Sequence, residues 1–295
     1  MLSKPPMSVI KGGIFPMLAH RYDKSGRKIN WPAYAQPKLD GNRCITIARK
    51  GKVTMWTRSR ESIESMPHIV KALERAAKDG DFILDGELYN HEYKSNFEDL
   101  TSLITQDKPA PGHEVVQYHI YDMPSANGGF EERYTQLGNF FRKYVPTKTA
   151  TPLILVETMK VFNDDGLTVA FEYFLLKGYE GAMVRNVEGV YKQNGKSYNL
   201  LKVKKMVDDE FKVVGVKEGR GKLAGHAIFI CDINDGDTFD AKMKGPVSDL
   251  KKYWNNPSLA VGRMVTVQFQ GYTKYEIPRF PVALRFRPTH KGGIL

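Results

Sequence analysis

Alternating and continuous apolar runs divide the first two thirds of the chain into short strands and helices. A hairpin is predicted over 43–58, because β-rich runs at Cys44–Ile47 and Val53–Trp56 flank the turn Arg49–Lys52. Further strands are predicted at Phe82–Tyr89, Val115–Asp122, Leu153–Thr158, Glu180–Arg185 and Asn199–Lys205. Helical periodicity predicts helices at Ser65–Gly80, Glu131–Tyr144 and Leu167–Lys177, with Tyr134, Leu137, Phe141 and Tyr144 on the buried face of the second.

The pattern changes near residue 206. Beyond it come short β runs at Phe211–Lys217, Ala227–Ile233, Thr238–Met243, Met264–Tyr272 and Val282–Phe286, with one short helix at Ser248–Trp254. This content is typical of a small OB-fold barrel. The strands and helices before it are mixed rather than strictly alternating, which favours an α+β domain with antiparallel sheets. The sequence therefore predicts an α+β domain over 1–206 and an OB-fold domain over 207–295.

The charge of the chain indicates the class of partner. Its 295 residues carry a formal net charge of +11, with a pI near 9.4. Such an excess favours an anionic partner, and nucleic acid is the commonest one. A basic balance that only aids solubility is the alternative. Charge alone names no chemistry.

Cysteine usage and hydropathy indicate the compartment. Cys44 and Cys231 each lie in an apolar strand-like run, which predicts buried reduced thiols rather than a disulfide. The seven histidines are scattered without the spacing of a zinc site. The first residues contain no apolar signal segment, and no run has the length of a membrane span. These features predict a protein of the cytoplasm that binds neither zinc nor membrane.

One stretch, Ala35-Gln36-Pro37-Lys38-Leu39-Asp40-Gly41-Asn42-Arg43, combines groups suited to nucleotide chemistry. A lysine at a strand end can act as a nucleophile once it loses its proton, and Arg43 can donate a fork of hydrogen bonds to phosphate or ribose. Gly41 would allow a sharp turn. A charged β-turn explains the same letters, so the stretch needs support from elsewhere.

That support comes from polar side chains placed inside other apolar strands. Glu87 lies in Asp85-Gly86-Glu87, Tyr121-Asp122 closes another strand, and Glu180 opens Glu180-Gly181-Ala182-Met183-Val184-Arg185. Lys202 and Lys204 alternate in Leu201-Lys202-Val203-Lys204, and period two places both on one face of their strand. Two lysines on one buried face repel unless an anion lies between them, which predicts a phosphate pocket.

In this order and spacing the set resembles the nucleotidyltransferase motifs of ATP-dependent DNA ligases, a superfamily shared with RNA ligases and mRNA capping enzymes. Lys38 to Arg43 matches the nucleophile motif, and Thr57-Arg58-Ser59-Arg60-Glu61 resembles the next. Pro278-Arg279-Phe280-Pro281 resembles the end of the ligase OB domain. The resemblance implies a nucleotidyltransferase (adenylation) domain followed by an OB-fold, the layout of a minimal two-domain ligase of the viral, phage or small bacterial type.

The resemblance also implies a reaction and its cofactors. Lys38 would attack the α-phosphate of ATP and become lysyl-AMP; the AMP would move to the 5′-phosphate of a nick, which the 3′-hydroxyl then seals. ATP and Mg²⁺, with Mn²⁺ as a possible substitute, are the implied cofactors. The implied partner is nicked duplex DNA, met in replication, repair and recombination, and the implied state is a monomer in the cytoplasm or host cytoplasm.

Residue roles follow from the matched positions. Lys38, Glu180, Lys202 and Lys204 would be catalytic, the two later lysines by binding phosphate. Gln36 would contact the adenine edge, Tyr121 would stack on the base, and Arg43 and Glu87 would hold the ribose. Glu180 and Glu87 would lie near the metal. Arg58, or Arg60 if the register shifts, would contact the nick phosphate, and Arg287 and Lys291 would orient pyrophosphate.

Two departures from larger ligases shape the expectation. Only 37 residues precede Lys38, which leaves no room there for a helical DNA-binding domain. The OB segment is also too compact for the long DNA-encircling hairpin of some minimal ligases. Binding to DNA through basic surface would then be modest and steeply dependent on salt.

Three readings therefore compete. An RNA ligase or a GTP-using capping enzyme shares the lysine motif, and a non-catalytic OB-type protein would explain the charge and the barrel. The last would leave Lys38, Glu87 and Glu180 as accidents. The order of the motifs and Pro278-Arg279-Phe280-Pro281 favour the DNA ligase.

Overall fold

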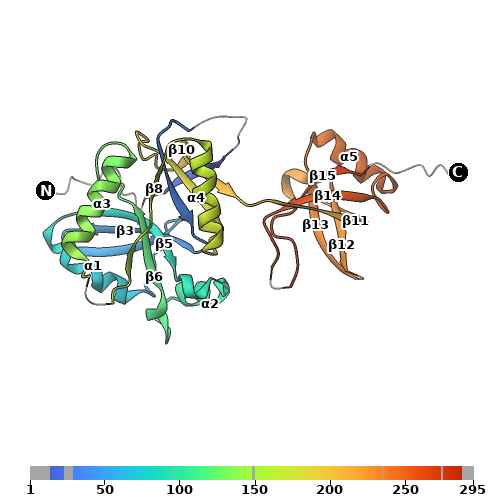
Figure 1. Ribbon diagram of the computed structural model, residues 1–295. Helices are drawn as coiled ribbons and strands as arrows, with labels where there is room; N and C mark the ends of the chain where they lie inside the picture. Colours follow the sequence, from blue (N-terminus) through green and yellow to red (C-terminus); the bar gives the residue numbers. More distant parts are fainter. Residues whose placement is uncertain are drawn as a thin grey trace. The chain divides into compact units, whose positions relative to one another are not determined.

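The computed structural model describes residues 14–22, 29–94, 96–147, 150–234, 236–273 and 275–287. The chain divides into two compact units, Met1–Val203 and Lys204–Leu295 (Figure 1). The sequence pattern predicted the boundary between the two domains near residue 206. The first unit contains two five-stranded sheets, and the second is built on a closed barrel.

The first sheet has the strand order β1-β10-β9-β2-β8. Its strands are β1 (Met17–Arg21), β2 (Ala33–Lys38), β8 (Met159–Val161), β9 (Gly181–Asn186) and β10 (Gly195–Lys204). Helix α4 (Asp164–Leu176) packs on β2, β8 and β9 and buries Leu167, Ala170 and Phe174 against them. The side chain of Asn163 caps this helix by accepting from the Gly166 N–H at 2.8 Å.

The second sheet has the order β4-β3-β5-β6-β7 and carries the larger core. Its strands are β3 (Asn42–Arg49), β4 (Lys52–Thr57), β5 (Phe82–Tyr89), β6 (Gln117–Asp122) and β7 (Leu153–Leu155). Helices α1 (Pro67–Asp79) and α3 (Phe130–Tyr144) pack on it, and α2 (Phe97–Ile104) adds two buried side chains to the same core (Figure 1). Short 3₁₀ turns lie at His91–Tyr93 and His113–Val115. The predicted hairpin over 43–58 is confirmed as the β3–β4 pair.

The buried face of α3 agrees with the predicted one at Leu137 and differs from it elsewhere. Its fully buried residues are Phe130, Arg133, Leu137 and Phe140, whereas Tyr134, Phe141 and Tyr144 pack at the edge of the core. Arg133 is 1% exposed and pairs with Asp122 on β6. A pattern that counts only apolar residues does not recognise an arginine as part of the core. It therefore predicted the adjacent face of the helix, which carries Tyr134, Phe141 and Tyr144.

The second unit is a closed barrel of strands in the order β11-β12-β13-β15-β14. They are β11 (Val207–Glu218), β12 (Ala227–Asn234), β13 (Asp237–Met243), β14 (Met264–Phe269) and β15 (Val282–Phe286). Helix α5 (Val247–Asn255) buries Leu250, and its Tyr253 and Trp254 pack against the barrel core. Short 3₁₀ turns lie at Gly221–Leu223 and Pro257–Leu259. The OB-like content predicted from the sequence is confirmed.

Strand directions are mostly antiparallel, as predicted, but β1–β10, β6–β7 and β13–β15 are parallel. Each of these pairs joins strands that are far apart in the chain, so no tight hairpin turn constrains their direction. Cys44 and Cys231 are free and buried, as predicted. Among the described residues, no helix is both long and apolar enough to cross a membrane.

Candidate active site

A cavity of about 260 Å³ opens at the end of β2 in the first unit. Its polar lining brings together side chains from β2, β3, β5, β6, β9 and β10. The polar and charged lining residues are Gln36, Lys38, Arg43, Arg58, Glu87, Tyr121, Arg185, Lys196 and Lys202. Cations outnumber carboxylates around it, which suits a polyanionic ligand.

Lys38, which lines this cavity, forms an ion pair with Glu180. The pairing of β2 with β9 places Lys38 opposite Gly181, and the Glu180 N–H donates to the Lys38 carbonyl at 3.2 Å. The side chains are 20% and 13% exposed, so the pair is shielded yet still reachable from the cavity. The backbone register therefore holds the Glu180 carboxylate directly beside the Lys38 amine.

Gly41 and Gly86, two glycines of the motifs, lie so close to neighbouring backbone that a side chain would not fit at either position. A Cβ on Gly41 would lie 2.5 Å from the Leu88 carbonyl, and one on Gly86 would lie 2.5 Å from the His119 carbonyl. Neither glycine has a positive φ angle. Glycine is therefore needed at position 41 for a steric reason and not for a sharp turn. With a side chain at this position, β3 and β5 could not approach each other so closely.

Glu87 and Tyr121 face each other on one wall of the cavity. Tyr121 Oη donates to Glu87 Oε2 and to the Gly86 carbonyl, both at 3.2 Å. The β3–β5 register places Arg43 directly opposite Glu87. Burial raises the pKa of Glu87 to about 7, although the Arg43 and Lys38 cations and the Tyr121 hydrogen bond act in the opposite direction. Glu87 can thus change its charge near neutral pH.

This shift predicts a pH dependence of stability. A carboxyl whose pKa is raised on folding stabilises the folded protein while it is protonated, and that contribution declines as pH rises from about 4.5 to about 7. We expect Glu87→Gln to remove this part of the decline, because its amide does not titrate. Urea unfolding at about pH 5 and about pH 8 measures the difference. The exposed Glu157→Gln serves as control, and identical pH profiles for Glu87→Gln and wild type would contradict the prediction.

Gln36 is buried, and its amide is engaged by the protein. Its Nε2 donates to the Tyr121 carbonyl at 3.2 Å and to Thr158 Oγ1 at 2.9 Å, and its Oε1 accepts from Arg185 Nε at 2.7 Å. A guanidinium only donates, so Arg185 determines which end of the amide points where. Both amide hydrogens have acceptors, and the adenine contact predicted for Gln36 stays a prediction.

Gln36 is linked through Arg185 to a buried network of charged side chains, to which the sequence analysis gave no role. Asp122 accepts from Arg133 Nε at 2.8 Å and from Arg185 Nη1 at 2.8 Å, and all three side chains are at most 3% exposed. The Arg185 guanidinium also lies 5.3 Å from the centre of the Tyr121 ring. Arg133 lies outside every motif. The one feature of the sequence that could have indicated its role is that it is a charged residue at helical spacing from the buried residues Phe130 and Leu137.

The two lysines of β10 make different contacts. Lys202 lines the cavity, together with Lys196, which was not predicted. Lys204 belongs to the second unit, where its Nζ donates to Gln270 Oε1 at 2.6 Å and lies 5.6 Å from the Phe280 ring. A phosphate contact of Lys204 therefore stays a prediction.

The two candidate arginines for the nick phosphate also differ. Arg58 is exposed and lines both the cavity and a neighbouring hollow of about 570 Å³. Arg60 has a φ angle of 70°, its guanidinium lies 3.9 Å from the centre of the Phe15 ring, and it is not among the residues that line either space. The geometry favours Arg58 over Arg60.

The predicted pyrophosphate-orienting residues lie at the end of the chain. Arg287 follows β15 and contacts Glu210 Oε1 at 3.2 Å with a side chain that is 60% exposed. Lys291 lies outside the described residues. Both roles stay predictions.

Two carboxylates could bind a magnesium ion here: Glu87 lines the cavity, and Glu180 contacts the cavity residue Lys38. No cluster of three or more His, Cys, Asp or Glu side chains suited to a metal occurs within the described ranges. Mg²⁺ usually binds through one or two carboxylates together with water and substrate phosphates, so Glu87 and Glu180 are the candidate protein ligands.

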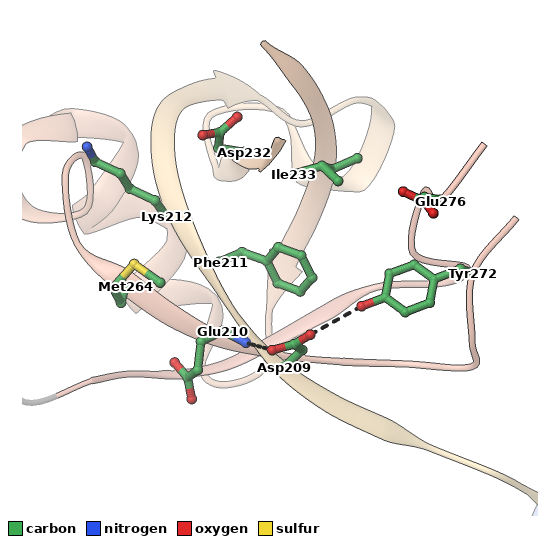
Figure 2. Close-up of a pocket in the computed structure, with 9 residues that line it drawn as sticks. All are labelled: Asp209, Glu210, Phe211, Lys212, Asp232, Ile233, Met264, Tyr272 and Glu276. Carbon is green, nitrogen blue, oxygen red and sulfur yellow. Dashed lines mark hydrogen bonds between the residues drawn. The ribbon is translucent and has the colours of Figure 1, made fainter. Parts of the chain in front are cut away.

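A separate hollow of about 570 Å³ lies in the barrel, and its lining is mainly acidic, in contrast to the cation-lined cavity at Lys38 (Figure 2). Asp209, Asp232 and Glu276 lie around it, and Tyr272 Oη donates to Asp209 at 3.2 Å. In Figure 2 the carboxylate of Glu210 points away from Phe211 and Tyr272, and Lys212 is the single cation among the described residues that line the hollow. A space lined by so many carboxylates does not suit a triphosphate, whereas the cation-lined cavity at Lys38 does.

Comparison with known proteins agrees with this geometry. Residues 16–204 match the family model of the ATP dependent DNA ligase domain, and residues 218–287 match that of the DNA ligase OB-like domain. A DNA ligase of enterobacteria phage T6 is 23% identical over 92% of this chain and 68% of its own length. A DNA ligase of African swine fever virus is 26% identical over 78% of this chain and 56% of its own length.

Solved structures show the same fold. The structure of a Lig E DNA ligase, described as DNA binding with a minimal scaffold, is 26% identical and has a TM-score of 0.74. It covers 95% of this chain, which in turn covers 100% of that one. With a catalytic-domain model that spans more than half of the chain and an OB-like model that follows it, the chain belongs to the ATP-dependent DNA ligases.

Proposed function

We propose that this ligase seals nicks in duplex DNA through an AMP carried on Lys38. The observation that supports this most directly is the Lys38–Glu180 ion pair in a cation-lined cavity. In the first step the Lys38 nitrogen forms a bond to the α-phosphorus of ATP, and the bond to pyrophosphate breaks. The proton of Lys38 passes to the Glu180 carboxylate that it already contacts.

The later steps use the same cavity. The AMP moves from Lys38 to the 5′-phosphate of the nick, which regenerates the lysine. The 3′-hydroxyl then attacks that phosphate, seals the strand and releases AMP. Lys202 and Lys196 offset charge on the phosphates in transit, and Arg58 binds the 5′-phosphate at the rim. Arg287 orients pyrophosphate, and Lys204 binds phosphate together with Lys202.

The nucleotide is held by the wall that carries Tyr121. Its ring stacks on adenine, while Arg43 and Glu87 bind the ribose. Mg²⁺, or Mn²⁺ in its place, would be held by Glu180 and Glu87 and would supply charge stabilisation to the phosphates.

Tyr121→Ala tests the stacking. We expect ATP binding to weaken by about 1–3 kcal/mol, the scale of base–aromatic stacking. Tyr121→Phe should bind ATP nearly normally, because it keeps the ring and loses only the hydroxyl that bonds Glu87 and Gly86. Calorimetric titration with a non-hydrolysable ATP analogue measures both, and equal losses would show that the hydroxyl rather than the ring matters.

The proposed function is tested with nucleotide labelled at the α-phosphate. We expect covalent label from ATP and none from GTP, followed by transfer to a nicked duplex with a 5′-phosphate and formation of a sealed strand. Label from GTP would indicate a capping enzyme. Label from ATP with sealing confined to RNA ends would indicate an RNA ligase, and no label would leave a nucleic-acid-binding protein.

A further inference from the structure

Arg43 is held at the cavity by a closed ring of hydrogen bonds. Its Nε and Nη2 donate to the two oxygens of Asp85 at 2.7 and 2.6 Å, and Nη2 also donates to the Met17 carbonyl at 3.1 Å. Tyr191 Oη donates to Asp85 Oδ2 at 2.7 Å and accepts from the Met17 N–H at 3.1 Å. Met17, Arg43, Asp85 and Tyr191 come from four separate segments, so the ring closes only in the folded protein.

The ring leaves one part of the guanidinium for a ligand. Among the described residues, none accepts a hydrogen bond from Nη1 of Arg43, although Arg43 lines the cavity. The guanidinium lies 5.3 Å from the centre of the Tyr121 ring, the surface proposed to stack on adenine. A guanidinium is planar, so hydrogen bonds at Nε and Nη2 prevent it from rotating. The N–H groups of Nη1 therefore keep one direction.

Tyr191 is itself fastened to the rest of the unit. It lies in the segment that follows β9, and its ring centre is 5.7 Å from the Arg133 guanidinium. Arg133 Nη1 donates to the Gly189 carbonyl of the same segment at 2.8 Å. Asp85, which Tyr191 contacts, is 0% exposed, so water cannot replace the tyrosine hydroxyl there at low cost.

We propose that Tyr191 is a positioning residue for the nucleotide, which acts by holding Asp85 and, through it, Arg43. The inference rests on the proposed function and deepens it. With the hydroxyl present, Asp85 has its second oxygen shared between Tyr191 and Arg43, and the guanidinium is kept in the plane that presents Nη1 to the ribose of ATP. Without the hydroxyl, Asp85 and Arg43 gain rotational freedom and the ribose contact weakens.

Tyr191→Phe tests this because it removes one oxygen and keeps the ring over Arg133. We expect the KM for ATP in multiple-turnover nick sealing to rise about tenfold, the scale of one hydrogen bond to a charged group, with kcat within about twofold of wild type. Tyr34→Phe is the matched control. It also removes a hydroxyl that donates to a carboxylate, that of Glu131, and Tyr34 does not line the cavity. Its KM should equal that of wild type.

A double-mutant cycle shows whether the effect passes through Arg43. In an Arg43→Gln background we expect Tyr191→Phe to cause no further rise in KM, because the group that it positions is already absent. An unchanged KM in the single variant, or a full tenfold rise in the Arg43→Gln background, would overturn the inference. Failure of the proposed function is a separate result, since the wild-type enzyme itself would then take no label from ATP.

Discussion

Lys38→Ala is expected to take no covalent label from α-labelled ATP and to seal no nicks. The amine is the only group of this side chain that the proposed reaction requires, and it forms an ion pair with Glu180 at the wall of the cavity. A covalent intermediate has no substitute path when its nucleophile is removed, so the loss should reach the detection limit of the assay. Gel electrophoresis of labelled protein measures it.

Two variants separate the chemistry from the fold. Lys38→Arg should also fail to label, because a guanidinium stays protonated at any usable pH. Both variants should unfold at nearly the temperature of wild type, since the Lys38–Glu180 pair lies at the wall of a cavity rather than in a core. Full labelling of Lys38→Ala would remove the proposed mechanism.

Asp122→Ala is expected to lose about 3–5 kcal/mol of unfolding free energy, the largest stability effect that we predict. Asp122 is 0% exposed and is the ion-pair partner of both Arg133 and Arg185, which are themselves buried. Its removal leaves two guanidinium groups in the interior without their counter-ion. Urea unfolding followed by circular dichroism measures the change.

The same residue has a pH signature. Burial acts to raise the pKa of Asp122, but Arg133 and Arg185 outweigh it and the pKa is lowered. The stabilisation is therefore present above the ordinary pKa of an aspartate and is lost as pH falls through the lowered value. Asp79→Ala, which breaks an exposed pair with Lys143, is the control and should change little. A comparable small loss for Asp122→Ala would show that the network is dispensable.

The sequence by itself determined the family, the two-part architecture and most of the residues around the cavity. Strand patterns are local, and period two fixes which side chains share a face. The motifs are also local, so Lys38, Arg43, Glu87, Tyr121 and Glu180 could be read without knowledge of the partner strands. The comparisons confirm the ligase family and the OB-like second domain.

Only the tertiary structure decided how these side chains are held. Arg133 lies on α3 and is distant in sequence from Gln36, yet both belong to one network through Asp122 and Arg185. A periodicity that counts apolar residues places a helical arginine on the surface, because a buried charge is unfavourable without its partner. That partner comes from another strand, and a linear pattern carries no signal for it.

The strand-end lysines show the same limit. Alternation places Lys202 and Lys204 on one face, and β10 contains both, but only the structure shows that Lys204 bonds to Gln270 in the second unit. Tyr191 reaches Asp85 only because the segment after β9 folds back beside β1. Sequence spacing fixes the order of side chains along a strand, whereas contacts between distant segments depend on how the sheets pair and where each unit ends.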